Sequence, residues 1–139
     1  MALKIERVDV WSGEIRDEVG GLTRKLEPLA AAGADLSFLI ARRRPERPGT
    51  GVVFLGGLKG AKQTKAAEAA GLTKTSELAG ARIEATNKPG LLYQLVERLA
   101  SAGINLRGVS ASVTGIRCVI MLAFDSAADR DNAARLLRK

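Results

Sequence analysis

The sequence lacks histidine, contains one cysteine and has few aromatic residues, and each shortage argues against a class of function. A single cysteine cannot form a disulfide within the chain, and the absence of histidine removes the usual Cys/His metal sites. Aromatic residues make up 4% of the chain, whereas sheets that bind RNA present aromatic rings for base stacking. We therefore expect no metal site, and RNA binding is an alternative rather than the leading hypothesis.

Long hydrophobic runs are also missing. No apolar stretch approaches the roughly 18–20 residues that a helix needs to cross a bilayer. The first ten residues, MALKIERVDV, lack the apolar centre of a signal peptide. We therefore expect a cytoplasmic protein without a membrane partner.

Residues with the chemistry of catalysis are scarce. Cys118 lies inside the apolar stretch 116–124, where a cysteine is usually an inert core residue. The carboxylates are scattered without an evident acid–base pair. The segment 56–60 (GGLKG) lacks the G-x-x-x-x-G-K-[ST] spacing of a phosphate-binding loop. We therefore expect that the protein is not an enzyme, has no catalytic residues and uses no cofactor.

Positive charge exceeds negative charge, with 22 Lys and Arg against 15 Asp and Glu and a net charge of +7. The excess is spread along the chain, which typically serves solubility rather than a binding face. The one dense basic run is Arg42-Arg43-Arg44, followed by Arg47. Two alternatives stay open: a scaffold whose loop 42–50 docks on an acidic partner, and an RNA-binding ferredoxin-like protein.

One segment of the sequence occurs twice. Residues 20–36 read GGLTRKLEPLAAAGADL and residues 90–106 read GLLYQLVERLASAGINL, and seven of their leucine, alanine and glycine positions coincide at an offset of 70 residues. That spacing exceeds the roughly 20–50 residues of a solenoid repeat and has the size of a small domain. Because a domain of this size is marginally stable by itself, we expect the two copies to share an interface or to pair with copies from another chain.

Apolar periodicity and turn residues predict similar elements in both halves. In the second half we expect strands at 81–86, 106–113 and 116–124, and helices from 91 up to Gly103 and over 127–137. In the first half we expect strands at 5–10, 36–41 and 51–58, helices at 22–32 and 61–70, and loops at 13–19 and 42–50.

This order predicts an α+β fold of two ferredoxin-like βαββαβ modules, each an antiparallel sheet with its helices on one face. The predicted boundaries are 1–72 for the first module and 81–139 for the second. Residues 73–80 are predicted to be a linker or the closing strand of the first module.

Residues 81–106 contain two motifs, one at each end of the predicted helix. They are Asn87-Lys88-Pro89-Gly90-Leu91-Leu92 and Ala100-Ser101-Ala102-Gly103-Ile104-Asn105-Leu106. With these motifs the segment resembles the ACT domain, a small regulatory module that binds amino acids. The resemblance implies a tandem ACT domain protein whose modules pair edge to edge into a wider sheet, with an amino acid bound at the seam. It further implies allosteric signalling through association, a homodimer, and a separate enzyme as a regulated partner.

The predicted ligand-binding residues flank the helix of the second copy. A glycine before the first helical turn leaves backbone N–H groups free for a carboxylate, and Asn105 offers an amide donor and a carbonyl acceptor. Alternatively, Pro89-Gly90 only makes the turn, and Asn105 only satisfies loop backbone or adopts a left-handed conformation after Gly103. The predicted site residues are Asn87, Lys88, Pro89, Gly90, Leu91, Ile104 and Asn105.

The first copy departs from this pattern. It has Asp17-Glu18-Val19-Gly20 in place of the turn, and Asp35 in place of Asn105. Three carboxylates near one site would repel a carboxylate ligand. We therefore expect the first copy to have a structural role, and the alternative is that it binds a different ligand.

Overall fold

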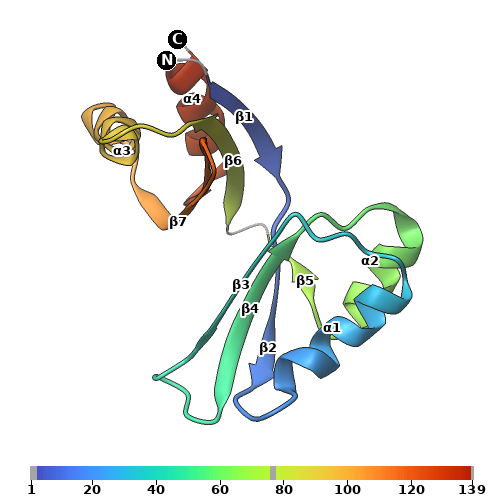
Figure 1. Ribbon diagram of the computed structural model, residues 1–139. Helices are drawn as coiled ribbons and strands as arrows, with labels where there is room; N and C mark the ends of the chain where they lie inside the picture. Colours follow the sequence, from blue (N-terminus) through green and yellow to red (C-terminus); the bar gives the residue numbers. More distant parts are fainter. Residues whose placement is uncertain (1–2, 76–77, 139) are drawn as a thin grey trace. The chain divides into compact units, whose positions relative to one another are not determined.

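The computed structural model describes residues 3–75 and 78–138. The chain divides into two compact units, which we call the first module, residues 9–75, and the second module, residues 3–8 together with 78–138. Figure 1 shows the helices and strands of each. Residues 76 and 77, part of the predicted linker 73–80, lie outside the described residues.

The first module is a four-stranded sheet in the order β3-β4-β2-β5, in which every pairing is antiparallel. Both of its helices lie on one side of the sheet (Figure 1), where they cover a core that contains Trp11, Val53 and Leu72. Its elements are β2 (Trp11–Arg16), α1 (Gly21–Ala31), β3 (Phe38–Arg43), β4 (Thr50–Gly56), α2 (Gly60–Ala69) and β5 (Thr73–Lys74).

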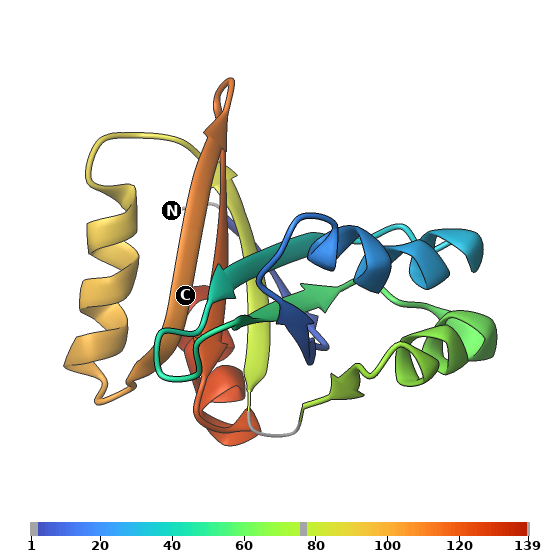
Figure 2. The same ribbon diagram turned by 90° about the horizontal axis from the view of Figure 1, so that it is seen from below.

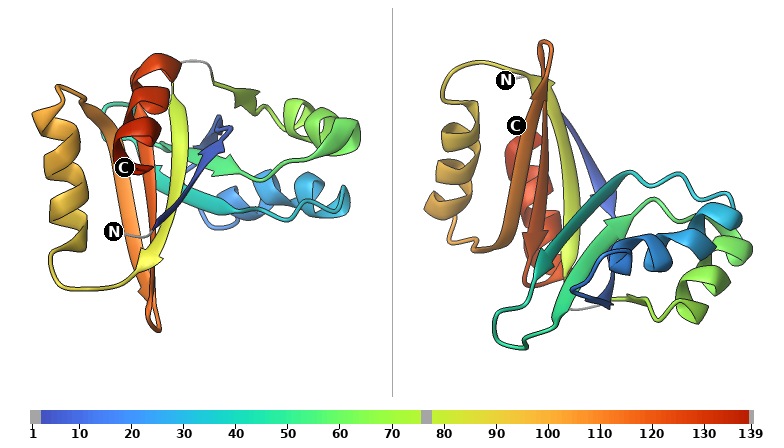
Figure 3. Two further views of the ribbon diagram at one scale, coloured as in Figure 1. Left: turned by 90° about the horizontal axis from the view of Figure 1, so that it is seen from above. Right: turned by 60° about the horizontal axis from the view of Figure 1, so that its bottom comes forward.

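The second module is also a four-stranded antiparallel sheet, in the order β1-β6-β8-β7. Strands β7 and β8 form a long hairpin (Figure 2). Both helices pack on one face of the sheet (Figure 3), against Ile83, Ile120 and Phe124. Its elements are β1 (Leu3–Val8), β6 (Ala79–Thr86), α3 (Leu91–Ser101), β7 (Leu106–Thr114), β8 (Arg117–Phe124) and α4 (Ala127–Arg138).

The periodicity of α3 explains how the second module builds its core. Leu91, Leu95 and Leu99 follow one another at intervals of four residues and are at most 2% exposed. On β8 the alternate residues from Cys118 to Phe124 face the same core. These two periods, close to 3.6 residues on the helix and two on the strand, are the ones that the sequence displays. The predicted α+β fold of two ferredoxin-like modules is confirmed.

The first strand of the chain belongs to the second module, which corrects the prediction of a first-module strand at 5–10. Strand β1 pairs with β6, with Ile5 opposite Ile83, and Ile5 is buried in that core. Strand β2 is the first strand of the first module, the position predicted for residues 5–10. It includes residues 13–16, which were predicted to lie in the loop 13–19. Gly13 occurs in a strand because a Cβ there would lie 2.7 Å from Cδ2 of Leu72.

The two modules are therefore nested. The first module is inserted between β1 and β6, so that the fourth strand of the second sheet precedes its other three along the chain. The boundaries 1–72 and 81–139 are corrected accordingly. The part of the closing strand that the structure describes is β5, which pairs only with Trp11 and Ser12.

Candidate functional site

The turn before α3 has the conformation that the Pro-Gly sequence predicts. Gly90 adopts φ 81° and ψ 1°, the left-handed region that favours glycine, and no side chain caps the helix. The N–H of Leu91 donates to the Lys88 carbonyl at 3.2 Å, and the N–H of Gln94 donates to that of Gly90 at 3.0 Å. Within residues 3–75 and 78–138, no group accepts a hydrogen bond from the N–H groups of Leu92 and Tyr93.

The space above this turn is open. Among the described residues, a Cβ built on Gly90 would meet no atom within 4 Å other than those of its immediate chain neighbours. The side chains of Asn87, Lys88 and Pro89 are exposed, whereas Leu91 is buried in the core. The predicted site residue Leu91 therefore anchors the helix and leaves only its backbone available at the surface.

The turn is fixed to the tip of the β7–β8 hairpin. The N–H of Asn87 donates to the Ile116 carbonyl at 2.7 Å, and Ile116 lies between the end of β7 and the start of β8. The first turn of α3 is thus held beside the far end of β7. A ligand on the Leu92 and Tyr93 N–H groups would lie near that end.

Ile104 and Asn105 lie at the opposite end of α3. Gly103 has φ 75°, and the Ile104 N–H closes the helix with a 2.9 Å bond to the Leu99 carbonyl. Ile104 packs against the core, whereas Asn105 is exposed. Among the described residues, the Asn105 side chain makes no hydrogen bond, so the alternative that it satisfies loop backbone is wrong for this module.

The predicted site residues are therefore not brought together within one module. Helix α3 has 11 residues, and at 1.5 Å per residue its ends are about 16 Å apart. Asn87–Leu91 lie at one end, and Ile104 and Asn105 at the other. The ammonium and carboxylate of one amino acid are bonded to the same carbon, so a single module cannot hold both groups with these residues.

The first module repeats the turn with different chemistry. Gly20 has φ 83° and precedes a helix of 11 residues, as Gly90 does. Asp17 pairs with Arg43 at 2.8 Å, and Glu18 pairs with Arg24. The repulsion expected from these two carboxylates is therefore largely offset, because each has a basic partner. Sequence reasoning missed this because Arg43 lies 26 residues beyond Asp17 on another strand.

The basic hairpin between β3 and β4 is mostly neutralised within its own module. Arg43 pairs with Asp17, Arg44 with Glu46 at 3.6 Å, and Arg47 with Glu14 at 3.0 Å. A hydrogen bond from its own backbone and the neighbouring Arg44 lower the pKa of Glu46, so that this carboxylate stays charged. Since three of the four arginines have carboxylate partners, the hairpin offers little free charge to an acidic partner or to RNA.

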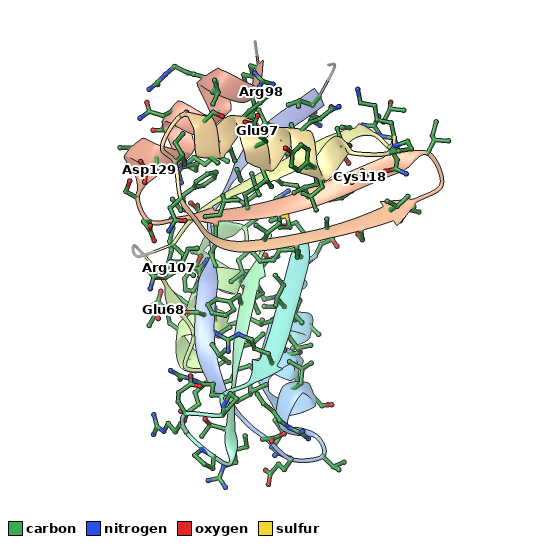
Figure 4. The ribbon with its side chains drawn as sticks, turned by 90° about the vertical axis from the view of Figure 1, so that its left-hand side faces the viewer. Glu68, Glu97, Arg98, Arg107, Cys118 and Asp129 are labelled. Carbon is green, nitrogen blue, oxygen red and sulfur yellow. The ribbon has the colours of Figure 1, made fainter. Side chains whose placement is uncertain are left out.

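Other kinds of site find no support in the part of the chain that the structure describes. Cys118 is a free, buried cysteine on β8 (Figure 4). No group of three or more acidic, cysteine or histidine side chains there could hold a metal ion. No helix among these residues is long and apolar enough to cross a membrane.

Solved structures share this fold at low sequence identity. A protein of Bacteroides thetaiotaomicron matches with a TM-score of 0.77 and 18% identity, over 96% of this chain and 88% of that one. The regulatory subunit of aspartate kinase from Thermus thermophilus matches with a TM-score of 0.64 and 16% identity, over 97% of this chain and 92% of that one. E. coli aspartokinase III, solved with aspartate and ADP, matches with a TM-score of 0.62 and 12% identity, over 98% of this chain and 32% of that one.

These matches confirm the predicted ACT-like fold. No protein-family model matches the chain, and no curated protein matches its sequence.

Proposed function

We propose that this protein is a regulatory amino-acid-binding protein whose ligand site is built between two ACT-like modules. In this proposal the chain acts in the cytoplasm without catalysing a reaction, and paired copies convey the presence of the ligand to a separate enzyme. Two of the proteins that share the fold are a regulatory subunit of aspartate kinase and an aspartokinase solved with aspartate. Both support a regulatory role connected with amino acids.

Two groups of the second module form the proposed half-sites: the N–H groups of Leu92 and Tyr93 form one, and the side-chain amide of Asn105 forms the other. Their separation is the observation that supports the proposal. The free N–H groups of Leu92 and Tyr93 and the unpaired amide of Asn105 are about 16 Å apart along α3. A ligand that uses both must therefore take one half-site from each of two modules.

Strand β7 supplies the means of pairing. It is an edge strand of its sheet, and its residues 108–114 (GVSASVT) carry no charge. An uncharged edge strand presents unpaired N–H and C=O groups to another strand. If β7 of one copy pairs antiparallel with β7 of a second, the start of each strand lies beside the end of the other. Asn105 of one copy then approaches the Gly90 turn of the other, which is tied to Ile116.

Exposed apolar side chains accompany this edge. They lie on α3, on β7 and at the tip of the hairpin, and the least covered is Ile116, at 75% exposure. Apolar side chains gathered at the surface commonly mark an interface with another protein. The residues are Leu92, Tyr93, Val109, Val113 and Ile116.

The two half-sites offer complementary groups to an amino acid. The Leu92 and Tyr93 N–H groups, at the positive end of the α3 dipole, suit the carboxylate. The side-chain carbonyl of Asn105 can accept a hydrogen bond from the ammonium group. A ligand that bridges two copies binds the paired state more tightly than the separate copies, so it shifts the equilibrium toward pairing. The fraction of paired copies then reports the presence of the ligand.

Thermal unfolding in the presence of each of the twenty amino acids tests ligand binding. At a hundredfold excess over Kd, the cognate amino acid should add about 2.7 kcal/mol to the free energy of unfolding. Asn105→Ala should abolish this gain and leave the melting temperature of the ligand-free protein nearly unchanged, because the side chain is exposed and unbonded.

Asn132→Ala, at an exposed position on α4, is the matched control and should retain the full response. The absence of a shift with every amino acid would refute the proposed function. An equal loss of ligand-free stability in Asn105→Ala would show that this residue is structural.

A further inference from the structure

Arg130 is the one charged residue that is buried in the part of the chain that the structure describes, at 5% exposure. It lies on α4, in line with Ala133 and Leu137, which are both fully buried in the core of the second module. Spacings of three and seven residues place all three on the face of the helix that packs on the sheet. An arginine therefore occupies a position where the periodicity of α4 predicts an apolar side chain.

The charged end of Arg130 is covered as well as its hydrocarbon stem. An arginine at the edge of a core commonly buries the stem and keeps the guanidinium in water. Only 7% of the Arg130 side chain is exposed, which is too little for a guanidinium that stands in solvent. A buried charge lowers the stability of the folded state unless hydrogen-bonding partners surround it.

The protein satisfies this guanidinium only in part. Nε donates to Oδ1 of Asp131, the next residue along the helix, at 3.3 Å. Within residues 3–75 and 78–138, the Nη1 and Nη2 groups of Arg130 donate no hydrogen bond. A guanidinium has five N–H donors, and four of them belong to these two groups. Most of the hydrogen-bonding capacity of a buried cation is therefore unused.

The two Nη groups are covered, yet they can be touched from solvent. Among the described residues, every side-chain nitrogen or oxygen that is sealed from solvent has a hydrogen-bond partner. Because Nη1 and Nη2 have none, neither of them is sealed. An oxygen atom of a small molecule can therefore reach them, whereas the small exposed area offers no surface on which a protein partner could pack.

We propose that Arg130 binds the carboxylate of a small molecule through Nη1 and Nη2. One N–H of each group points along the same edge of the planar guanidinium, and this pair matches the two oxygens of a carboxylate. The bond from Nε to Asp131 holds the guanidinium in place and leaves that edge free. Asp131 is exposed, so solvent weakens its repulsion of a second carboxylate. This site goes beyond the proposed amino-acid site, shares none of its residues and does not depend on it.

Two-dimensional NMR of the full chain tests the proposal with sodium acetate as the probe, at constant ionic strength set with sodium chloride. Acetate should cause saturable shifts of the Arg130 Nε–H signal and of the amides in the first two turns of α4. Inorganic phosphate is the comparison, because it is an anion without the planar pair of oxygens. Tighter binding of phosphate than of acetate would contradict the assignment of a carboxylate.

Two variants of Arg130 separate the charge from the fork of N–H groups. Arg130→Lys keeps the charge and removes the fork, so it should bind acetate at least about tenfold more weakly. Arg130→Met replaces the cation with an apolar chain of similar length. It should abolish the acetate response and leave the melting temperature of the ligand-free protein at least as high, because no buried charge remains.

Arg135→Met makes the same change on an exposed residue of α4 and is the matched control, which should retain wild-type affinity for acetate. No saturable shift with acetate in the wild-type chain would overturn the proposal, as would unchanged acetate affinity in both Arg130 variants. A lower ligand-free melting temperature in Arg130→Met would show that the guanidinium already has its partners within the protein, which would also overturn it.

Discussion

Deletion of residues 1–8 is expected to unfold the second module while the first module stays folded. The deletion removes β1, which pairs with β6 over six residues and contributes Ile5 to the core. It also removes the Ile5 carbonyl that accepts a hydrogen bond from Arg138 at 3.1 Å. The cost should exceed about 4 kcal/mol, comparable with the whole stability of a small domain. Amide NMR would show collapsed dispersion for the second module only.

Trp11 provides a separate signal for the first module, because it is the one tryptophan of the chain and is buried in that module's core. Its fluorescence should keep its native value in the deletion variant. A fully folded second module after the deletion would contradict the nested topology.

A circular permutant is the matched control for the deletion. In this variant residues 1–8 follow Lys139 through a short flexible linker, which places the four strands of the second module in the order of an uninterrupted βαββαβ unit. Because Arg138, in the last turn of α4, already contacts Ile5, a short connection should suffice. The permutant should recover the second module's NMR spectrum.

Two lysines placed on β7 are expected to abolish self-association. Ser110→Lys/Ser112→Lys leaves the pairing of β7 with β8 in place, because both side chains stand on the face of the sheet away from the core, opposite Met121 and Val119. In an antiparallel pair of β7 strands, the added charges of the two copies lie close together and repel. The dissociation constant of the dimer should rise at least about a hundredfold, as sedimentation equilibrium would measure.

The control for this variant adds the same charge elsewhere. Ala61→Lys/Ala69→Lys places two lysines on exposed positions of α2 and should leave the dimer intact. The β7 variant should also lose the thermal response to an amino acid, because its half-sites no longer meet. A β7 variant that still dimerises with wild-type affinity would exclude β7 as the interface.

The sequence predicted the local structure of the second module well. Strand β6, helix α3, the β7–β8 hairpin and α4 lie within a few residues of their predicted ranges. Local sequence patterns predict these elements: apolar residues recur every three to four positions on α3, and glycine-containing turns occur at Gly90 and Gly115.

Features that depend on distant partners could not be predicted. The alternation in residues 3–8 is the same whether the strand joins the first sheet or the second, and its partner β6 lies about 75 residues further along the chain. By sequence alone Gly13 favours a loop, because its contact with Leu72 is formed only in the folded module. The neutralised carboxylates of the first module depend in the same way on ion pairs with Arg43 and Arg47.

In the proposed function, each amino-acid site takes its turn from one copy and its asparagine from the other. Mixing two variants that are each unable to bind tests this arrangement. Gly90→Asn places a side chain over the free N–H groups at a position with room for it, and asparagine tolerates positive φ. Asn105→Ala removes the opposite half-site. Gly49→Asn, at φ 85° with equally open space, is the control for the glycine change.

In a mixed dimer of these two variants, one shared site carries both defects and the other carries none, because a two-fold pairing exchanges the half-sites. After subunit exchange in an equal mixture, half of the dimers are mixed, so about a quarter of all sites should bind. Calorimetry of the mixture with the cognate amino acid should measure that stoichiometry at wild-type affinity. If the mixture binds no more than either variant alone, the site shared between two copies is refuted.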